Sequence, residues 1–231
     1  MKYTLLFSLL LLSALASASS AFLNRLEKVY AEYKYLLKAE SCGNPVFDSA
    51  ILSAQDKNNL LRWLIPDHGC INKTSQLYST STLCDADEWR RNVTGHPNIL
   101  IVAKTVHGKK LGMFTPSGYV VGFSNSSDRF IHDDKLRMIS FSEREAHQIQ
   151  ELFQSASIAY SYGSEDFAYA GGGLRFWKDE EISEDKCGVT YDILEADEYF
   201  SCELSYQQLL GDSDFQYALI ETLETFELYF S

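Results

Sequence analysis

The first part of the chain carries two helical patterns of apolar residues. In the first pattern, apolar positions recur three or four residues apart, at Phe22, Leu26, Val29, Tyr33 and Leu36. This spacing places them on one face and predicts an amphipathic helix over residues 22–39. A second cluster, from Ile51 to Ile65, predicts another helix. This helix should end before Pro66, because proline disfavours helical backbone in the residue that precedes it.

Beyond about Ser75 the pattern changes to short segments typical of β-strands. Each segment is rich in apolar residues and is bounded by Gly, Asn, Asp or Ser; the segments are residues 76–78, 98–106, 110–115, 119–123, 136–141, 157–160 and 173–177. His107-Gly108 predicts a tight hairpin between two of them. One helix should interrupt the strands, since Ser142 and Glu145 have the spacing of a capping box ahead of an apolar run. These patterns predict an antiparallel sheet flanked by helices.

Length and charge narrow the classes of protein that this chain can belong to. It has 231 residues, of which 45% are apolar and 23% charged, a composition typical of one globular domain. Lys and Arg number 20 against 32 Asp and Glu, so the formal net charge is −12. This charge would repel a polyanion such as nucleic acid and an anionic membrane surface. We therefore expect neither as a partner.

Residues 1–18 predict a secretory signal peptide. Lys2 precedes an apolar run over residues 5–12, and the small residues Ala16-Ser17-Ala18 follow it. The run is short for a membrane span, so we expect no membrane insertion after cleavage; a retained signal anchor is the alternative. Three glycosylation sequons fit the same compartment, at Asn72, Asn92 and Asn125. We expect the protein to be secreted or to lie in the lumen of the secretory pathway.

Five cysteines remain after the predicted cleavage, at Cys42, Cys70, Cys84, Cys187 and Cys202. An oxidising compartment permits disulfides, but the odd number leaves at least one cysteine outside any intrachain pair. The sequence does not choose among the possible pairings. Because Cys187 and Cys202 flank a single acidic stretch, a local disulfide between them is one hypothesis.

No motif predicts a catalytic, metal or cofactor site. A G-x-S-x-G nucleophile motif is missing, and the five histidines stand in turn-like or polar surroundings typical of surface residues. Gly171-Gly172-Gly173 precedes a strand-like segment, whereas a phosphate-binding loop precedes a helix. The acidic groups lack the alternating oxygen ligands of an EF-hand. We therefore expect no catalytic residues, no cofactor and no metal ligands.

Several segments of the first half resemble, in order, the TLDc domain family. The family begins with an apolar helix and a Leu-Pro-like turn, to which residues 51–66 are similar. A Leu-Tyr-Ser strand and a helix with an aromatic anchor follow, as in residues 77–79 and Trp89. The next strand, turn and strand carry glycines, which match Gly108 and Gly112.

The second half continues the resemblance, which covers about residues 50–230. Residues 136–141 are a looser match to an apolar strand of the family. A Gly-rich segment before a strand is matched by Gly172 and Gly173. The family's ending, L-x-G, then Phe, then a Glu-containing strand with an aromatic residue, is similar to the segment that holds Gly211, Phe215 and Glu224.

The resemblance implies an α+β fold, namely an antiparallel two-sheet β-sandwich with flanking helices. Residues 215–230, whose own pattern fits helix or strand, are then the closing strand. The chain divides into a signal peptide (1–18), an amphipathic helix and turn (19–45) and a TLDc-like domain (50–231). The family is described as protecting against oxidative stress and binding the vacuolar proton pump, with no established catalytic residues.

The signal peptide changes which partner the resemblance can supply. Pump binding belongs to cytosolic members of the family, so we expect the vacuolar proton pump as partner only if this chain is cytosolic. We expect instead a secreted or luminal, non-enzymatic domain that binds a protein partner not named by the sequence. The alternatives are a thiol-dependent antioxidant or hydrolase, and a lectin-like binding module that uses the aromatic residues around Gly163.

Overall fold

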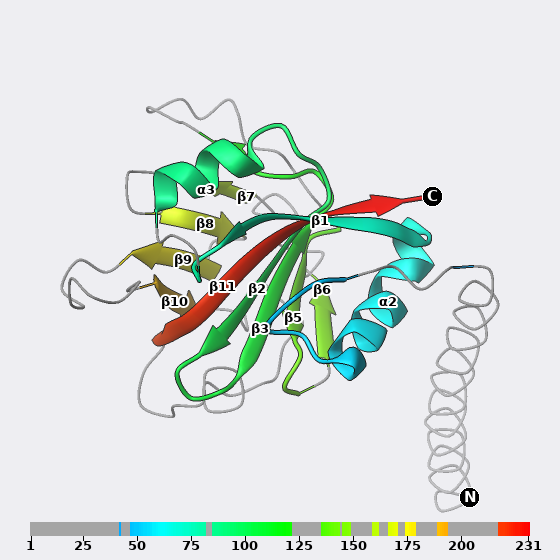
Figure 1. Ribbon diagram of the computed structural model, residues 1–231, viewed down its shortest axis with the longest axis horizontal. Helices are drawn as coiled ribbons and strands as arrows, with labels where there is room; N and C mark the ends of the chain where they lie inside the picture. The colour runs from blue at the N-terminus through cyan, green and yellow to red at the C-terminus, as the bar shows by residue number, and fades with distance from the viewer. Residues whose placement is uncertain are drawn as a thin grey trace, which may run out of the picture.

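The computed structural model describes residues 42, 47–81, 85–121, 135–143, 145–148, 159–161, 166–170, 174–178, 189–193 and 217–231. The predicted signal peptide and the predicted helix over residues 22–39 lie outside these residues. So do several other residues that the sequence singles out, namely Asn125, Gly172, Gly173, Cys187, Cys202, Gly211 and Phe215. The described residues form a mixed α+β fold built on an antiparallel sheet, as predicted (Figure 1).

Two helices and eleven strands make up the described part of the chain. The helices are α2 (Ala54–His68) and α3 (Ala86–Val93). The strands are β1 (Ile71–Ser79), β2 (Ile99–Thr105), β3 (Lys110–Thr115), β4 (Val120–Val121), β5 (Arg137–Ser140), β6 (Glu145–Gln148), β7 (Ala159–Ser161), β8 (Asp166–Ala170), β9 (Leu174–Lys178), β10 (Val189–Ile193) and β11 (Tyr217–Phe230).

The long closing strand β11 organises the sheet. One edge of β11 pairs with β2, and the other edge pairs with β10 and then with β1. From β2 the sheet continues through β3 and β5 to β6, and from β10 through β9, β8 and β7 to β4. These ladders are antiparallel except the short parallel pair of β4 and β7. Figure 1 shows β11 in red beside β2, with β3 on the far side of β2.

The main hydrophobic core lies between α2 and the sheet. Leu60 and Leu64, one helical turn apart, are buried in a cluster with Val102 of β2 and Phe226 of β11. Alternate residues of a strand point to opposite faces, so Ile101 of β2 faces away from this cluster, and it too is fully buried. Both faces of the central strands are therefore covered, with α2 on one of them (Figure 1).

Helix α3 packs on the opposite face of β11 through one aromatic side chain. Trp89 is fully buried, and its indole N–H donates to the hydroxyl of Thr225 at 2.9 Å. Asp85 begins the helix by accepting hydrogen bonds from the N–H groups of Asp87 and Glu88, as an N-cap does. The sequence expectation of a Leu-Tyr-Ser strand followed by a helix with an aromatic anchor is thus met by β1 and α3.

The predicted end of the first described helix is wrong. Helix α2 continues through Pro66 to His68, and the N–H of Gly69 closes its last turn on the carbonyl of Ile65 at 3.0 Å. Proline removes one backbone donor, but the packed side chains of Leu64 and Ile65 hold the turn in place. Gly69 ends the helix at a φ of 93°, a conformation that favours glycine.

The helix predicted to begin near Ser142 is also wrong at its start. Glu145 and the three residues after it form β6, which pairs antiparallel with β5. The Ser142 hydroxyl accepts from the backbone N–H of Lys110 instead of capping a helix. Backbone pairing with an adjacent strand has outweighed a local capping signal of four residues, and the rest of the predicted helix lies outside the described residues.

One disulfide lies within the described residues, between Cys42 and Cys70. Their Cα atoms are 5.3 Å apart, and their sequence separation is 28. Cys70 lies between the end of α2 and the start of β1, so the bond joins Cys42 to this junction. The hypothesis of a bond between Cys187 and Cys202 concerns residues outside the described part.

Replacing Gly112 should destabilise the sheet. A Cβ atom at Gly112 would lie 2.8 Å from the ring of buried Phe141 and 3.1 Å from the carbonyl oxygen of Ile101. We expect Gly112→Val to lower the free energy of unfolding by about 2–3 kcal/mol, measured by urea denaturation. The control is Gly108→Asn in the β2–β3 hairpin, where φ is 79° and no atom lies within 4 Å of an added Cβ. Asparagine tolerates this φ, so the control should cost about 1 kcal/mol or less.

Removing the disulfide should also destabilise the fold. For a closed loop of 28 residues, the chain-entropy relation gives a stabilisation of about 3–4 kcal/mol. The double variant Cys42→Ser/Cys70→Ser should therefore unfold at a lower denaturant concentration than the wild type. An unchanged midpoint would show that these two cysteines are not bonded to each other in the purified protein.

Candidate functional site

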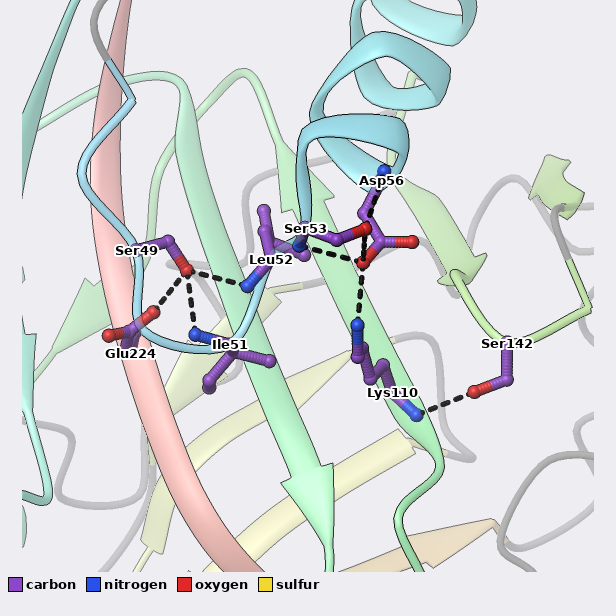
Figure 2. A network of polar contacts seen from close by, with 8 residues as sticks. All are labelled: Ser49, Ile51, Leu52, Ser53, Asp56, Lys110, Ser142 and Glu224. Atoms are coloured by element: carbon purple, nitrogen blue, oxygen red, sulfur yellow. Dashed lines mark hydrogen bonds and ion pairs between the residues drawn. The ribbon is translucent and has the colours of Figure 1, made fainter.

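A short segment before α2, residues 47–53, crosses over β11 and is called the strap here (Figure 2). Its apolar side chains belong to the main core. The ring of Phe47 lies 4.8 Å from the ring of Phe226, and Ile51 and Leu52 are buried in the same cluster. Burial of these three side chains fixes the strap against the sheet.

The middle of the strap is bound to a buried carboxylate of β11. The Ser49 hydroxyl donates to Glu224 Oε2 at 2.5 Å, and the Ala50 N–H donates to Glu224 Oε1 at 3.0 Å. The same hydroxyl oxygen accepts from the N–H groups of Ile51 and Leu52 at 3.1 and 3.0 Å (Figure 2). Glu224 is only 2% exposed, so these hydrogen bonds satisfy a carboxylate that water scarcely reaches.

A polar pocket of about 330 Å³ opens beside this contact. It lies between the strap, the end of β1 and β11. Its lining residues are Asp48, Ala50, Gln76, Leu77, Tyr78, Ser79, Ser81 and Glu224. Two of them are carboxylates and none is a lysine, arginine or histidine. The pocket is therefore electronegative.

Tyr78, at the pocket wall, is a buried residue. Burial raises the pKa of Tyr78 to about 12. Its hydroxyl oxygen accepts a hydrogen bond from the backbone N–H of Asp85 at 2.9 Å. The phenol therefore stays protonated at physiological pH and links β1 to the start of α3.

A second polar network fixes the start of α2 (Figure 2). Ser53 and Asp56 form a capping box, in which each side chain accepts from the backbone N–H of the other residue. Lys110 of β3 donates to Asp56 Oδ2 at 2.7 Å. Burial raises the pKa of Asp56, but the hydrogen bonds from Lys110 and Ser53 outweigh it and hold that pKa below its ordinary value of 3.8.

His96 contacts a buried carboxylate of β11. Its Nδ1 lies 2.8 Å from Glu227 Oε2, which also accepts from the Tyr229 hydroxyl at 2.5 Å. His68, expected at the surface, packs its ring 5.1 Å from that of Phe114.

Three of the sequence-predicted structural residues belong to the described part of the chain. Gly108 forms the β2–β3 hairpin, Gly112 makes room for Phe141 in β3, and Glu224 binds the strap. Of the sequons, Asn72 is exposed on β1, whereas Asn92 is half-buried near the end of α3. The other singled-out residues lie outside the described part of the chain.

The sequence reasoning missed both the strap and the capping box. The Ser-x-x-Asp spacing of Ser53 and Asp56, directly before an apolar run, is a local signal that could have located the start of α2. No local signal could have paired Ser49 with Glu224, because 175 residues separate them.

Comparisons with known proteins add no assignment. No family model matches the chain, and no curated protein matches it. Within the described ranges, no helix is long and apolar enough to cross a membrane. The same residues contain no group of three or more His, Cys, Asp or Glu side chains placed to hold a metal ion.

The contact between Asp56 and Lys110 predicts a pH dependence of stability. A carboxylate whose pKa is lower in the folded than in the unfolded state stabilises the fold above its unfolded pKa, and this stabilisation is lost as the pH falls through the folded pKa. We expect Lys110→Gln to cost about 1 kcal/mol at pH 7. Between pH 6 and pH 3 the variant should lose less of its free energy of unfolding than the wild type does.

The matched control for this experiment is Lys109→Gln. Lys109 pairs with Glu143 at 3.0 Å, and both side chains are partly exposed. Its removal should leave the acid dependence that arises from Asp56 unchanged. Equal slopes of unfolding free energy against pH for wild type and Lys110→Gln would contradict the role assigned to Lys110.

Proposed function

We propose that this chain is a secreted or luminal, non-catalytic protein-interaction domain related to the TLDc family. A role in protection against oxidative stress is part of this proposal through the resemblance. The finer fold that we propose is the two-sheet β-sandwich of that family. Its partner is a protein that uses the polar pocket beside the strap.

The order of elements supports the family proposal. A helix, a Leu-Tyr-Ser strand, a helix with a buried tryptophan and a glycine-containing hairpin occur in the expected sequence as α2, β1, α3 and β2–β3. The closing strand β11 carries a buried glutamate, Glu224. Burial of both faces of β2 supports a sandwich, because a strand covered on only one face would expose every second side chain.

The contact between Ser49 and Glu224 is the observation that favours binding over catalysis. A nucleophilic serine needs a base that takes its proton and oxyanion donors that face the substrate. The Ser49 oxygen instead accepts from two N–H groups of its own strap and donates to a carboxylate that also binds the Ala50 N–H. Every group of this contact is used to hold backbone in place.

The disulfide between Cys42 and Cys70 is compatible with a non-cytosolic protein. It also removes these two cysteines as candidates for the thiol-dependent antioxidant alternative, because bonded cysteines offer no thiolate. The remaining cysteines lie outside the described residues.

Expression in a secreting host tests the compartment. We expect an amino terminus directly after Ala18 and a gel shift on glycosidase treatment. Asn72→Gln should remove one glycan, because the Asn72 side chain is exposed on β1. Asn92→Gln is the comparison, since Asn92 is half-buried on α3 and a glycan fits there less well. An intact, unglycosylated chain would contradict secretion and make the vacuolar proton pump the leading partner.

Cross-linking in the same cells tests the interaction. Asp48→Asn changes an exposed side chain of the pocket and should weaken capture of a partner. Glu221→Gln removes the same charge from β11 outside the pocket, where Glu221 pairs with Lys104 at the surface, and should leave capture unchanged. Capture that responds equally to both variants would argue against the pocket as the binding site.

A further inference from the structure

Glu224 is a buried carboxylate that no lysine, arginine or histidine of the described residues pairs with. Its side chain accepts from the Ser49 hydroxyl and the Ala50 N–H, and within the described part of the chain no ion pair reaches it. Glu227, on the same strand and also buried, has His96 at 2.8 Å. Buried charges in proteins are normally paired, because an uncompensated charge away from water is costly.

This carboxylate is one of the residues that line the polar pocket. Glu224 lines the pocket from β11, and Asp48 adds a second carboxylate from the strap. The other polar lining groups are neutral, and they include Gln76 and the hydroxyls of Ser79 and Ser81, whose oxygens lie 2.7 Å apart. These groups can accept hydrogen bonds from a donor-rich ligand.

The size of the pocket and the polar groups that line it favour an organic cation over a metal ion. A metal ion is held by several ligands at about 2.0–2.6 Å around a small centre. The described residues provide no such group, and a volume of about 330 Å³ is far larger than one ion needs. A planar guanidinium has five N–H donors in a fixed fork and can reach two carboxylates and neighbouring hydroxyls at once.

The walls of the pocket are held in place before any ligand binds. The strap is fixed by the packing of Phe47 on Phe226 and by the hydrogen bonds of Ser49. The Cys42–Cys70 disulfide joins Cys42, which precedes the strap in the sequence, to the start of β1. A pocket whose walls are already ordered loses little conformational entropy on binding.

We propose that this pocket binds the guanidinium group of an arginine side chain presented by a protein partner. The guanidinium is the cationic partner that no described residue gives to Glu224. Asp48, which is exposed, is the second carboxylate that binds the guanidinium. This inference rests on the proposed function as an interaction domain and names the chemistry that the partner must present.

Peptide binding to the mature full chain tests the inference. The probe is the capped tripeptide Gly-Arg-Gly, compared by calorimetry at low salt with the same peptide carrying citrulline or lysine. We expect the arginine peptide to bind most tightly, and the neutral citrulline peptide to bind at least about fivefold more weakly. Added salt should weaken binding of the arginine peptide, because the mouth of the pocket is exposed.

Variants place the binding in the pocket. Asp48→Asn should weaken binding of the arginine peptide about threefold to fivefold, and Glu221→Gln should not change it. Asp48 is exposed, so the folded chain should tolerate its change. Glu224→Gln should abolish binding; thermal melting shows whether this variant is folded, and the proposal remains testable through Asp48→Asn if it is not.

Three outcomes would overturn the inference. They are equal binding of the arginine and citrulline peptides, equal effects of Asp48→Asn and Glu221→Gln, and no binding of the arginine peptide. Binding of argininamide as tight as that of the peptide would assign the pocket to a free small cation. It would overturn the proposal that a protein partner presents the arginine. If the arginine peptide fails while cross-linking still depends on Asp48, the interaction function stands and this ligand is wrong.

Discussion

Pairing along both edges of β11 is the constraint on which the rest of the structure depends. Residues 224–227 of this strand are hydrogen-bonded to β1 on one side and to β2 on the other. The side chains of such a strand must go to two buried faces, so α2 and the strap cover one face while Trp89 of α3 packs on the other. The closing segment of the chain is therefore its structural centre.

A charged residue within this centre determines how the strap is placed. Glu224 can be buried only if its oxygens find donors, and the strap provides a hydroxyl and a backbone N–H. The same two hydrogen bonds bring Asp48 beside the end of β1 and so create the pocket. Stability is thereby linked to the proposed binding, because Glu224 fixes the pocket wall and also makes the pocket electronegative.

Helix α2 is restrained at both ends, which makes this side of the domain a firm support for the pocket. At its start, the capping box of Ser53 and Asp56 is joined to β3 by Lys110. Beyond its end, Cys70 is bonded to Cys42. The strap leads directly into the first of these restraints. A rigid scaffold that positions a few polar groups is the usual basis of specific recognition.

The sequence alone determined the elements whose signals are local. The β2–β3 hairpin with Gly108 and the apolar strands around it follow from a pattern of a few residues. Assignment of residues 217–230 as a strand needed the family resemblance, since their own pattern fits helix or strand. Only the tertiary structure showed that α2 continues through Pro66 and that Glu145 belongs to a strand. The same holds for the bond between Cys42 and Cys70 and for the contact between Ser49 and Glu224. Packing and backbone pairing between distant segments decide these features, and a sequence pattern records only the preferences of neighbouring residues.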